Sequence, residues 1–189
     1  MRYGDDFVMG FQYEADARKM LVHLKQRLAK FKLALHEKKT RLIEFGKLVS
    51  DLRRKRGAAR CETFKFLGFT HYCAWSQDGR FVVKRRTDHK RLTRKLKELR
   101  GEARRRMHTP IVLQHQWLCS ALGGHVAYFG LPSNFDRINA FYRETCRLWY
   151  RALNRGSQRR FSWECFLRLL ERLPLPTPHI THPRPVVPC

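Results

Sequence analysis

The first part of the chain alternates short apolar runs with turn residues, which predicts strands around a single helix. Aromatic and β-branched residues flank Gly4-Asp5-Asp6 within residues 2–12, a pattern typical of a tight β-hairpin. A helix is expected over residues 14–32, because apolar side chains recur there at helical spacing on one face. These side chains are Ala17, Leu21, Leu24, Leu28 and Phe31.

Strands are also expected further on, with one polar interruption. Residues 39–46 predict a strand ended by Gly46, and residues 50–60 predict a basic polar loop. Residues 64–70 predict a buried strand, which is expected to continue to Trp75. Asp78-Gly79 then predicts a two-residue hairpin turn leading into a strand over residues 80–85.

From residue 88 onwards the apolar spacing becomes helical throughout. Helices are expected over residues 88–107, 110–129 and 134–154, with Thr109 as the N-cap of the second. A shorter helix runs from Ser162 to Leu173. The side chains expected to face the core are Leu92, Leu96, Leu99, Ala103, Met107, Leu113, Trp117, Leu118, Leu122, Ile138, Phe141, Thr145, Leu148 and Trp149.

This order of elements predicts an α+β protein made of two modules and a tail. Residues 1–87 form the β-rich module, and residues 88–173 form an all-α helical bundle. Residues 174–189 hold six of the eight prolines and are expected to be extended.

The net charge of +24, from 40 Lys and Arg against 16 Asp and Glu, points to a polyanionic partner. Nucleic acid is the first choice for this partner, and an anionic membrane surface is the alternative. A basic surface that serves only solubility is the remaining explanation. No run of 18 apolar residues predicts a membrane span, and the acidic start does not resemble a signal peptide, so a cytoplasmic location is expected. The six scattered cysteines predict neither zinc nor disulfides, and Cys119, Cys146 and Cys165 are expected in the core.

The basic residues gather in three places that are candidates for binding phosphates. For any single residue, a solvated surface is as good an interpretation, but residues 84–106 alone hold 12 Lys and Arg against three acids. The candidates are Arg53, Arg54, Lys55, Arg56, Arg91, Arg94, Lys95, Arg104, Arg105, Arg155, Arg159 and Arg160. Tyr72, Trp75 and Phe81 lie near the basic loop and could stack on bases, although Phe81 is more simply a core residue.

The Gly-Asp-Asp turn is the clearest candidate for chemistry. Nucleotide polymerisation uses two Mg²⁺ ions held by converging carboxylates, and a tight hairpin would project Asp5 and Asp6 from a rigid base. Taken alone, the triplet is more simply an ordinary turn, because Gly and Asp are common turn residues.

Four motifs in order resemble the group II intron reverse transcriptase/maturase family. Residues 2–8 are similar to its Tyr-Ala-Asp-Asp hairpin, and residues 36–42 to its His-Pro-Glu-Lys-Thr segment. Residues 66–69 resemble the strand that supports the primer end, and residues 147–155 the last helix of its thumb. The chain departs from the family at Gly4, where Ala is usual, and at Glu37 and Lys38, where Pro and Glu are usual.

The resemblance implies part of a polymerase palm in residues 1–87, followed by the thumb or maturase domain. It implies that Asp5 and Asp6 are Mg²⁺ ligands and that Lys39 lies near the incoming triphosphate. It also implies intron RNA and a template–primer duplex as partners, in reverse transcription by a mobile element and in RNA splicing. The fingers and another palm carboxylate are expected to precede residue 1, so the chain alone is expected not to polymerise.

Three interpretations stay open. The chain is a splicing-assisting RNA-binding module without catalysis, half of a nucleotidyltransferase completed by a separate N-terminal reverse transcriptase fragment, or a decayed remnant. A viral-type RNA polymerase also uses Gly-Asp-Asp, but residues 66–69 and 147–155 argue against it.

Overall fold

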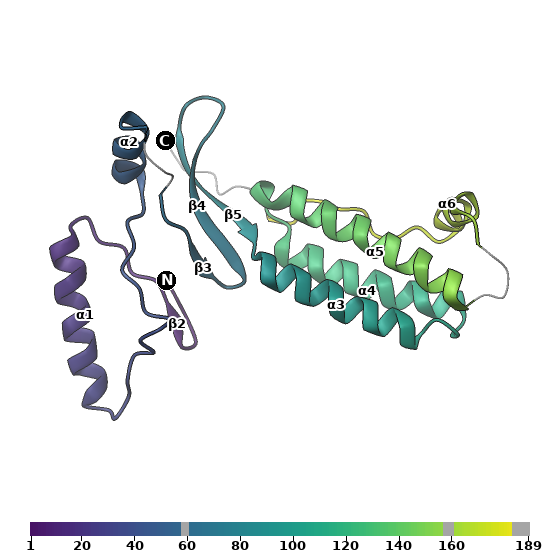
Figure 1. Ribbon diagram of the computed structural model, residues 1–189, viewed down its shortest axis with the longest axis horizontal. Helices are drawn as coiled ribbons and strands as arrows, with labels where there is room; N and C mark the ends of the chain where they lie inside the picture. The colour runs from purple at the N-terminus through teal and green to yellow at the C-terminus, as the bar shows by residue number, and fades with distance from the viewer. Residues whose placement is uncertain (58–60, 157–160, 183–189) are drawn as a thin grey trace. The chain divides into compact units, whose positions relative to one another are not determined.

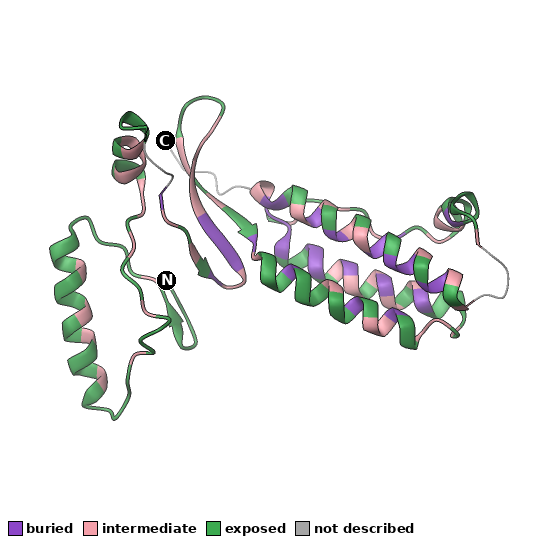
Figure 2. Cartoon of the chain, in the orientation of Figure 1, coloured by how far each residue is buried: buried purple, intermediate pink, exposed green. Residues whose placement is uncertain are grey.

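The computed structural model describes residues 1–57, 61–156 and 161–182, and the protein is mixed α+β. Its contacts divide the chain into two compact units, residues 1–84 and residues 85–189. The first unit holds the strands and two helices, and the second is helical (Figure 1). Most buried side chains belong to the second unit (Figure 2).

The first unit opens with the predicted hairpin. Strand β1 (Arg2–Tyr3) pairs antiparallel with β2 (Asp6–Phe7), with Tyr3 opposite Asp6. Gly4 has a φ of 56°, in the left-handed region that favours glycine in such turns.

Helix α1 (Glu14–Ala29) follows, as predicted, but it ends before residue 32. The Leu33 N–H donates to the Leu28 carbonyl and the Lys32 N–H to the Ala29 carbonyl, which is a Schellman closure. Lys32 takes the left-handed position, with a φ of 56°. No residue of α1 is buried, so its apolar stripe is at best half-covered.

The strand predicted over residues 39–46 is wrong, and so is the loop predicted over residues 50–60. Residues 36–40 form a turn, residues 41–45 have no strand partner, and helix α2 spans Lys47–Lys55. Gly46 precedes α2 with a φ of 125°, so a glycine expected to end a strand instead begins a helix.

The strand predicted over residues 64–75 is instead a hairpin. Strands β3 (Phe64–Phe66) and β4 (Phe69–Trp75) pair antiparallel, because Leu67 and Gly68 both adopt positive φ, 50° and 76°. Two central residues with positive φ make the type I′ turn that reverses paired strands.

Strand β5 (Phe81–Thr87) completes a sheet of order β3-β4-β5. The turn predicted at Asp78-Gly79 is confirmed, with a loop one residue longer. The Ser76 N–H donates to the Arg80 carbonyl at 2.8 Å, which leaves three loop residues, and Gly79 takes a φ of 70°.

The second unit consists of the predicted helices, α3 (His89–Arg105), α4 (Ile111–Phe129), α5 (Phe135–Gly156) and α6 (Trp163–Arg172). Helices α3 and α5 run in the same direction and α4 runs against them (Figure 1). Their apolar stripes meet in one core that includes Leu92, Leu99, Leu118, Leu122, Phe141, Leu148, Trp149 and Phe166. All five inward positions predicted on α5 are buried.

Three local predictions in this unit are wrong, one helix boundary shifts and one cap is confirmed. Thr109 does not cap α4, because its hydroxyl donates to the Arg106 carbonyl and Pro110 occupies the cap position. Leu113 is 51% exposed and Cys165 is exposed, so neither is a core residue. Gly156 is the last residue of α5, two residues beyond the predicted end. Ser162 does cap α6 and accepts from the Cys165 N–H.

Within the second unit, a short 3-10 helix, η1 (Pro132–Asn134), bonds to Thr87, the last residue of β5. Asn134 is 1% exposed, and its Oδ1 accepts from the Thr87 N–H at 2.7 Å. Its Nδ2 donates to the Phe129 carbonyl at 2.9 Å. One buried side chain therefore joins the end of β5 to the end of α4.

Residues 174–182 are extended and lie along the bundle (Figure 1). The His115 side chain bonds the Pro174 carbonyl at 3.0 Å, and the Thr181 N–H donates to the Gly130 carbonyl at 2.9 Å. Leu175 is 3% exposed and belongs to the core. This segment therefore covers the side of the bundle that α4 forms.

Candidate nucleic-acid interface

The hairpin presents Asp5 and Asp6 at the surface. Asp5 lies in the two-residue turn, Asp6 begins β2, and both are exposed. Among the described residues, no third acidic, His or Cys side chain joins them to form a metal-ligand group. A two-metal site needs carboxylates that converge from separate elements, and two neighbours on one hairpin do not supply that set. These residues therefore do not fit a complete Mg²⁺ pair.

Lys39 lies in the turn of residues 36–40, where its N–H donates to the His36 carbonyl at 3.0 Å. Its side chain is exposed. The structure thus gives Lys39 a defined backbone, and among the described residues no hydrogen bond or ion pair joins its side chain to Asp5 or Asp6.

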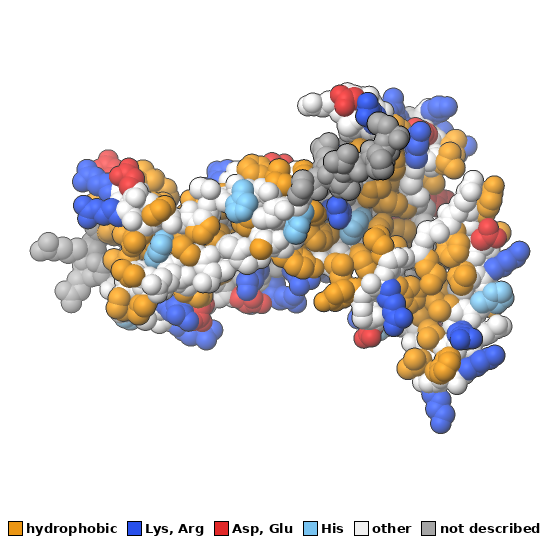
Figure 3. Space-filling model, turned by 180° about the vertical axis from the view of Figure 1, so that it is seen from behind, with side chains coloured by type: hydrophobic (Ala, Val, Ile, Leu, Met, Phe, Trp, Pro, Cys, Tyr) orange, Lys and Arg blue, Asp and Glu red, His pale blue; other side chains and the backbone are white. Residues whose placement is uncertain are grey.

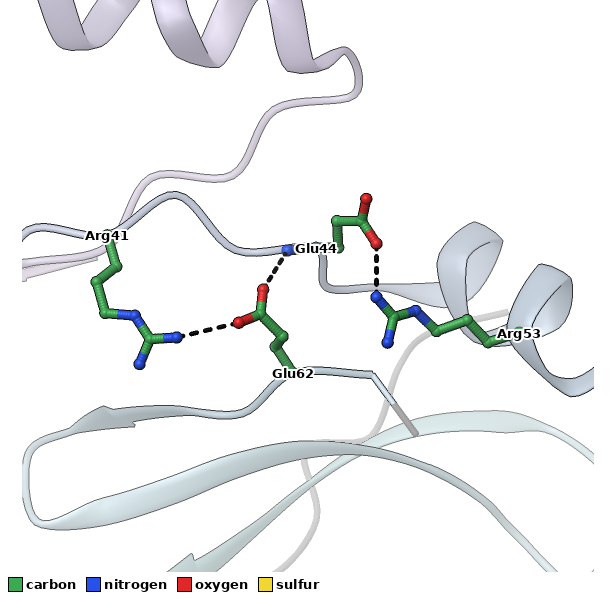
Figure 4. Close-up of polar contacts among 4 residues, drawn as sticks. All are labelled: Arg41, Glu44, Arg53 and Glu62. Atoms are coloured by element: carbon green, nitrogen blue, oxygen red, sulfur yellow. Dashed lines mark hydrogen bonds and ion pairs between the residues drawn. The ribbon is translucent and has the colours of Figure 1, made fainter. Parts of the chain in front are cut away.

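Arg53 on α2 makes a structural ion pair (Figure 4). Its guanidinium lies 2.8 Å from Glu44, and this hydrogen bond is the main reason that its pKa is raised. Glu62 accepts from the Glu44 N–H and from Arg41 at 3.0 Å. One of the Arg53 N–H groups is therefore bonded to Glu44, which holds α2 against the segment before it.

Three basic residues at the C-terminal end of α2 face solvent, one of them beside an aromatic side chain. Arg54, Lys55 and Arg56 are exposed, and the Arg54 guanidinium lies 5.0 Å from the Trp75 ring centroid. Phe81 meets the same ring edge to face at 5.7 Å. This arrangement brings cations and an aromatic ring of the first unit together, as the sequence predicted for this region.

The five candidate residues on α3 are all exposed, but they differ in their acidic partners. Arg94 and Lys95 lie 3.9 Å and 3.5 Å from Glu98, and Arg105 lies 3.5 Å from Glu102. Arg91 and Arg104 have no acidic partner among the described residues. Such exposed pairs are weak, so the partnered residues still add to the positive potential.

Charge is distributed unevenly over the second unit. Helix α3 carries eight Lys and Arg against two acids, and α5 carries five against two. Helix α4 has no charged residue at all, and neither has the segment of residues 174–182 beside it. In Figure 3 the blue side chains of this unit gather along its edges, while its middle is apolar, neutral or histidine. The positive field is therefore concentrated on α3 and α5.

A groove between α3 and α5 brings four arginines together. It has a volume of about 120 Å³ and is lined by Arg100, Arg104, Arg151 and Arg155 with apolar residues between them. Sequence reasoning selected Arg104 and Arg155 and missed Arg100 and Arg151. The missed signal is the spacing, because each pair is four residues apart on its helix and so shares a face. Arg159 and Arg160 lie outside the described residues.

The described helices include none that is both long and apolar enough to cross a membrane. Comparison with protein-family models, with curated proteins and with solved structures finds no match for the chain.

Proposed function

We propose that this protein binds nucleic acid, with RNA as its main partner, through the basic surface of α3 and α5. The observation that carries the proposal is the contrast between these two helices and the uncharged α4 of the same bundle. A surface that served only solubility would have no reason to place its charge on two neighbouring helices. A phosphate backbone needs such a continuous positive strip.

The finer proposal is that the chain acts as the palm end and thumb of a group II intron reverse transcriptase/maturase. The four ordered motifs support it, together with the β-hairpin at the Asp-Asp pair and the helical bundle that follows. In that role the bundle grips intron RNA and a template–primer duplex, and a maturase module without catalysis needs nothing more. RNA is recognised in this way mainly by its shape and backbone.

Binding should depend steeply on salt, because each phosphate that the protein neutralises releases counterions. We expect the affinity for a labelled structured RNA to fall about a thousandfold between 50 and 200 mM salt if about six phosphates are contacted. Fluorescence anisotropy over a salt series measures this slope. The matched control is an oligomer of the same base sequence with an uncharged backbone, which should not bind. Salt-independent binding, or equal binding of the uncharged oligomer, would contradict the proposal.

A second candidate function is half of a polymerase active site, and the surface of the first unit favours it. Large apolar side chains around the hairpin and α1 are unusually exposed, and α1 buries no residue. They include Tyr3, Met9, Tyr13, Val22, Phe31 and Leu33, which are 49–70% exposed. Exposed apolar surface of this extent indicates a covering partner, and the hairpin's unpaired edges are open to another strand.

Primer extension tests this second function. With an RNA template, a DNA primer and Mg²⁺, we expect no nucleotide incorporation by the chain alone, because the described residues supply only one carboxylate hairpin. Asp5→Ala is the control for contaminating polymerase. Extension that Asp5→Ala abolishes would show that the active site is complete after all.

A further inference from the structure

The groove between α3 and α5 has an apolar floor with arginines around it. Arg100 and Arg104 come from α3 and Arg151 and Arg155 from α5, while Ala103, Leu148 and Ala152 line it between them and are buried. The two small alanines let the helices approach, and the arginine stems can lie on apolar surface while their guanidinium groups stay in water. The positions of the four arginines are therefore set by helix packing and not by a loop.

No acidic side chain lines this groove, although acids are present on the same helices. Arg105 and Arg106 of the neighbouring turn share Glu102, and Arg147 pairs with Glu144. None of the four groove arginines has an ion-pair partner in the described part of the chain. Like charges four residues apart destabilise a helix slightly. The arginines of the groove therefore repel one another, and an anion bound among them would relieve this repulsion.

We propose that this groove binds two successive phosphates of a single nucleic-acid strand, which deepens the proposed function and rests on it. One phosphodiester carries a single negative charge and would leave most of the groove's positive charge unbalanced. On each helix the two arginines are one turn apart, about 6 Å along the axis, which provides two layers of donors. A guanidinium binds phosphate oxygens through two parallel hydrogen bonds, so each layer can hold one phosphate firmly.

The surroundings of the groove favour a nucleic-acid strand as its ligand. It is open, since all four arginines are exposed, and α3 and α5 carry further cations on either side. A strand can therefore enter the groove and continue along both helices, whereas a free phosphate ion would use only the groove. The same chemistry would hold either, so the two sources are separated by experiment.

The test compares two double variants that remove the same charge from the same unit. Arg104→Gln with Arg151→Gln alters the groove, and Arg168→Gln with Arg172→Gln alters exposed positions on α6, away from α3 and α5. We expect the groove variant to bind a single-stranded RNA at least about tenfold more weakly at physiological salt, because hydrogen bonds to charged groups are lost. Its salt slope should fall by about 1.4, the value for two phosphates of a single strand. The control variant should lose less than threefold and keep its slope.

Each outcome decides the proposal. Equal losses in both variants would mean that charge acts diffusely, and no loss in the groove variant would mean that the groove is not used. Displacement of the RNA by millimolar inorganic phosphate at constant ionic strength would identify a small-anion site instead. Any of these results overturns the inference while the wild-type protein still binds RNA. Failure of the wild-type protein to bind RNA would overturn the proposed function itself. Circular dichroism of both variants checks that the helices are intact.

Discussion

Trp149→Ala is expected to remove most of the stability of the helical unit. Trp149 is 1% exposed and lies in the core with Leu118, Leu122 and Phe166, whose ring meets it edge to face at 5.7 Å. Removing a buried aromatic side chain costs about 3–5 kcal/mol, from lost burial and from the cavity left behind. Small domains are stable by only about 5–15 kcal/mol, so this single change approaches the whole.

A hydrogen-bond chain adds to the loss. The Trp149 indole N–H donates to Gln114 Oε1 at 3.1 Å, and Gln114 Nε2 donates to the Thr109 carbonyl at 2.8 Å. Gln114 is 3% exposed, so Trp149→Ala leaves its oxygen buried without this donor. Chemical denaturation followed by circular dichroism measures the change in the free energy of unfolding.

Trp163→Ala is the matched control for this variant. It removes the same side chain from the start of α6, where Trp163 is 46% exposed and contacts Tyr150 and Phe166. Its cost should be a small part of that at Trp149. Equal losses at the two positions would mean that the core does not centre on Trp149.

The helical unit was predictable because its pattern repeats over many turns. Ile138, Phe141 and Trp149 recur at helical spacing through α5, and any packing of that helix must bury the same stripe. The prediction for Leu113 was wrong because it lies in the first turn of α4, where the apolar sequence is continuous and periodicity cannot select a face. The absence of charge from α4, which is visible in the sequence, was the better indication that this helix is covered by other parts of the chain.

The first unit was harder to predict because some of its turns contain residues that are not typical of turns. Leu67 and Lys32 both adopt positive φ without being Gly or Asn, so neither the β3-β4 turn nor the end of α1 was signalled. The sequence predicts a loop where α2 lies, because Arg53, Arg54 and Lys55 form a run typical of solvated residues. The ion pair between Arg53 and Glu44 depends on tertiary contact, which a local pattern does not contain.

The sequence predicted which stretch of the chain carries the candidate interface, but not which residues meet there in space. Composition alone identified the basic stretch of α3, since its charge excess is visible in any window of the sequence. The groove, however, exists only because α3 packs beside α5, which brings Arg100 and Arg104 to the same place as Arg151 and Arg155. These pairs are about fifty residues apart, and nothing in the sequence ties their faces together before the packing is known.

Acid should destabilise the helical unit through His125. This side chain is 7% exposed, lies on Phe141 with ring centroids 3.7 Å apart, and its Nε2 has no hydrogen-bond partner among the described residues. Burial and, to a smaller extent, the positive charge of Lys95 on α3 together lower its pKa from 6.5 to about 4. The folded protein therefore keeps His125 neutral at a pH where the unfolded chain would protonate it.

The direction of the effect follows from this difference. Between pH 6.5 and about 4 the unfolded state binds more protons than the folded state, so stability is complete above pH 6.5 and falls as the pH decreases. The accumulated loss is about 3 kcal/mol when the pH reaches the lower pKa. Urea denaturation at a series of pH values measures it. His125→Leu fills a similar volume without a titrating group, so its pH profile should be flatter by that amount, and it should be at least as stable at pH 7 because no unpaired nitrogen is buried. Parallel pH profiles for the two proteins would show that His125 is already protonated in the fold or is not buried as described.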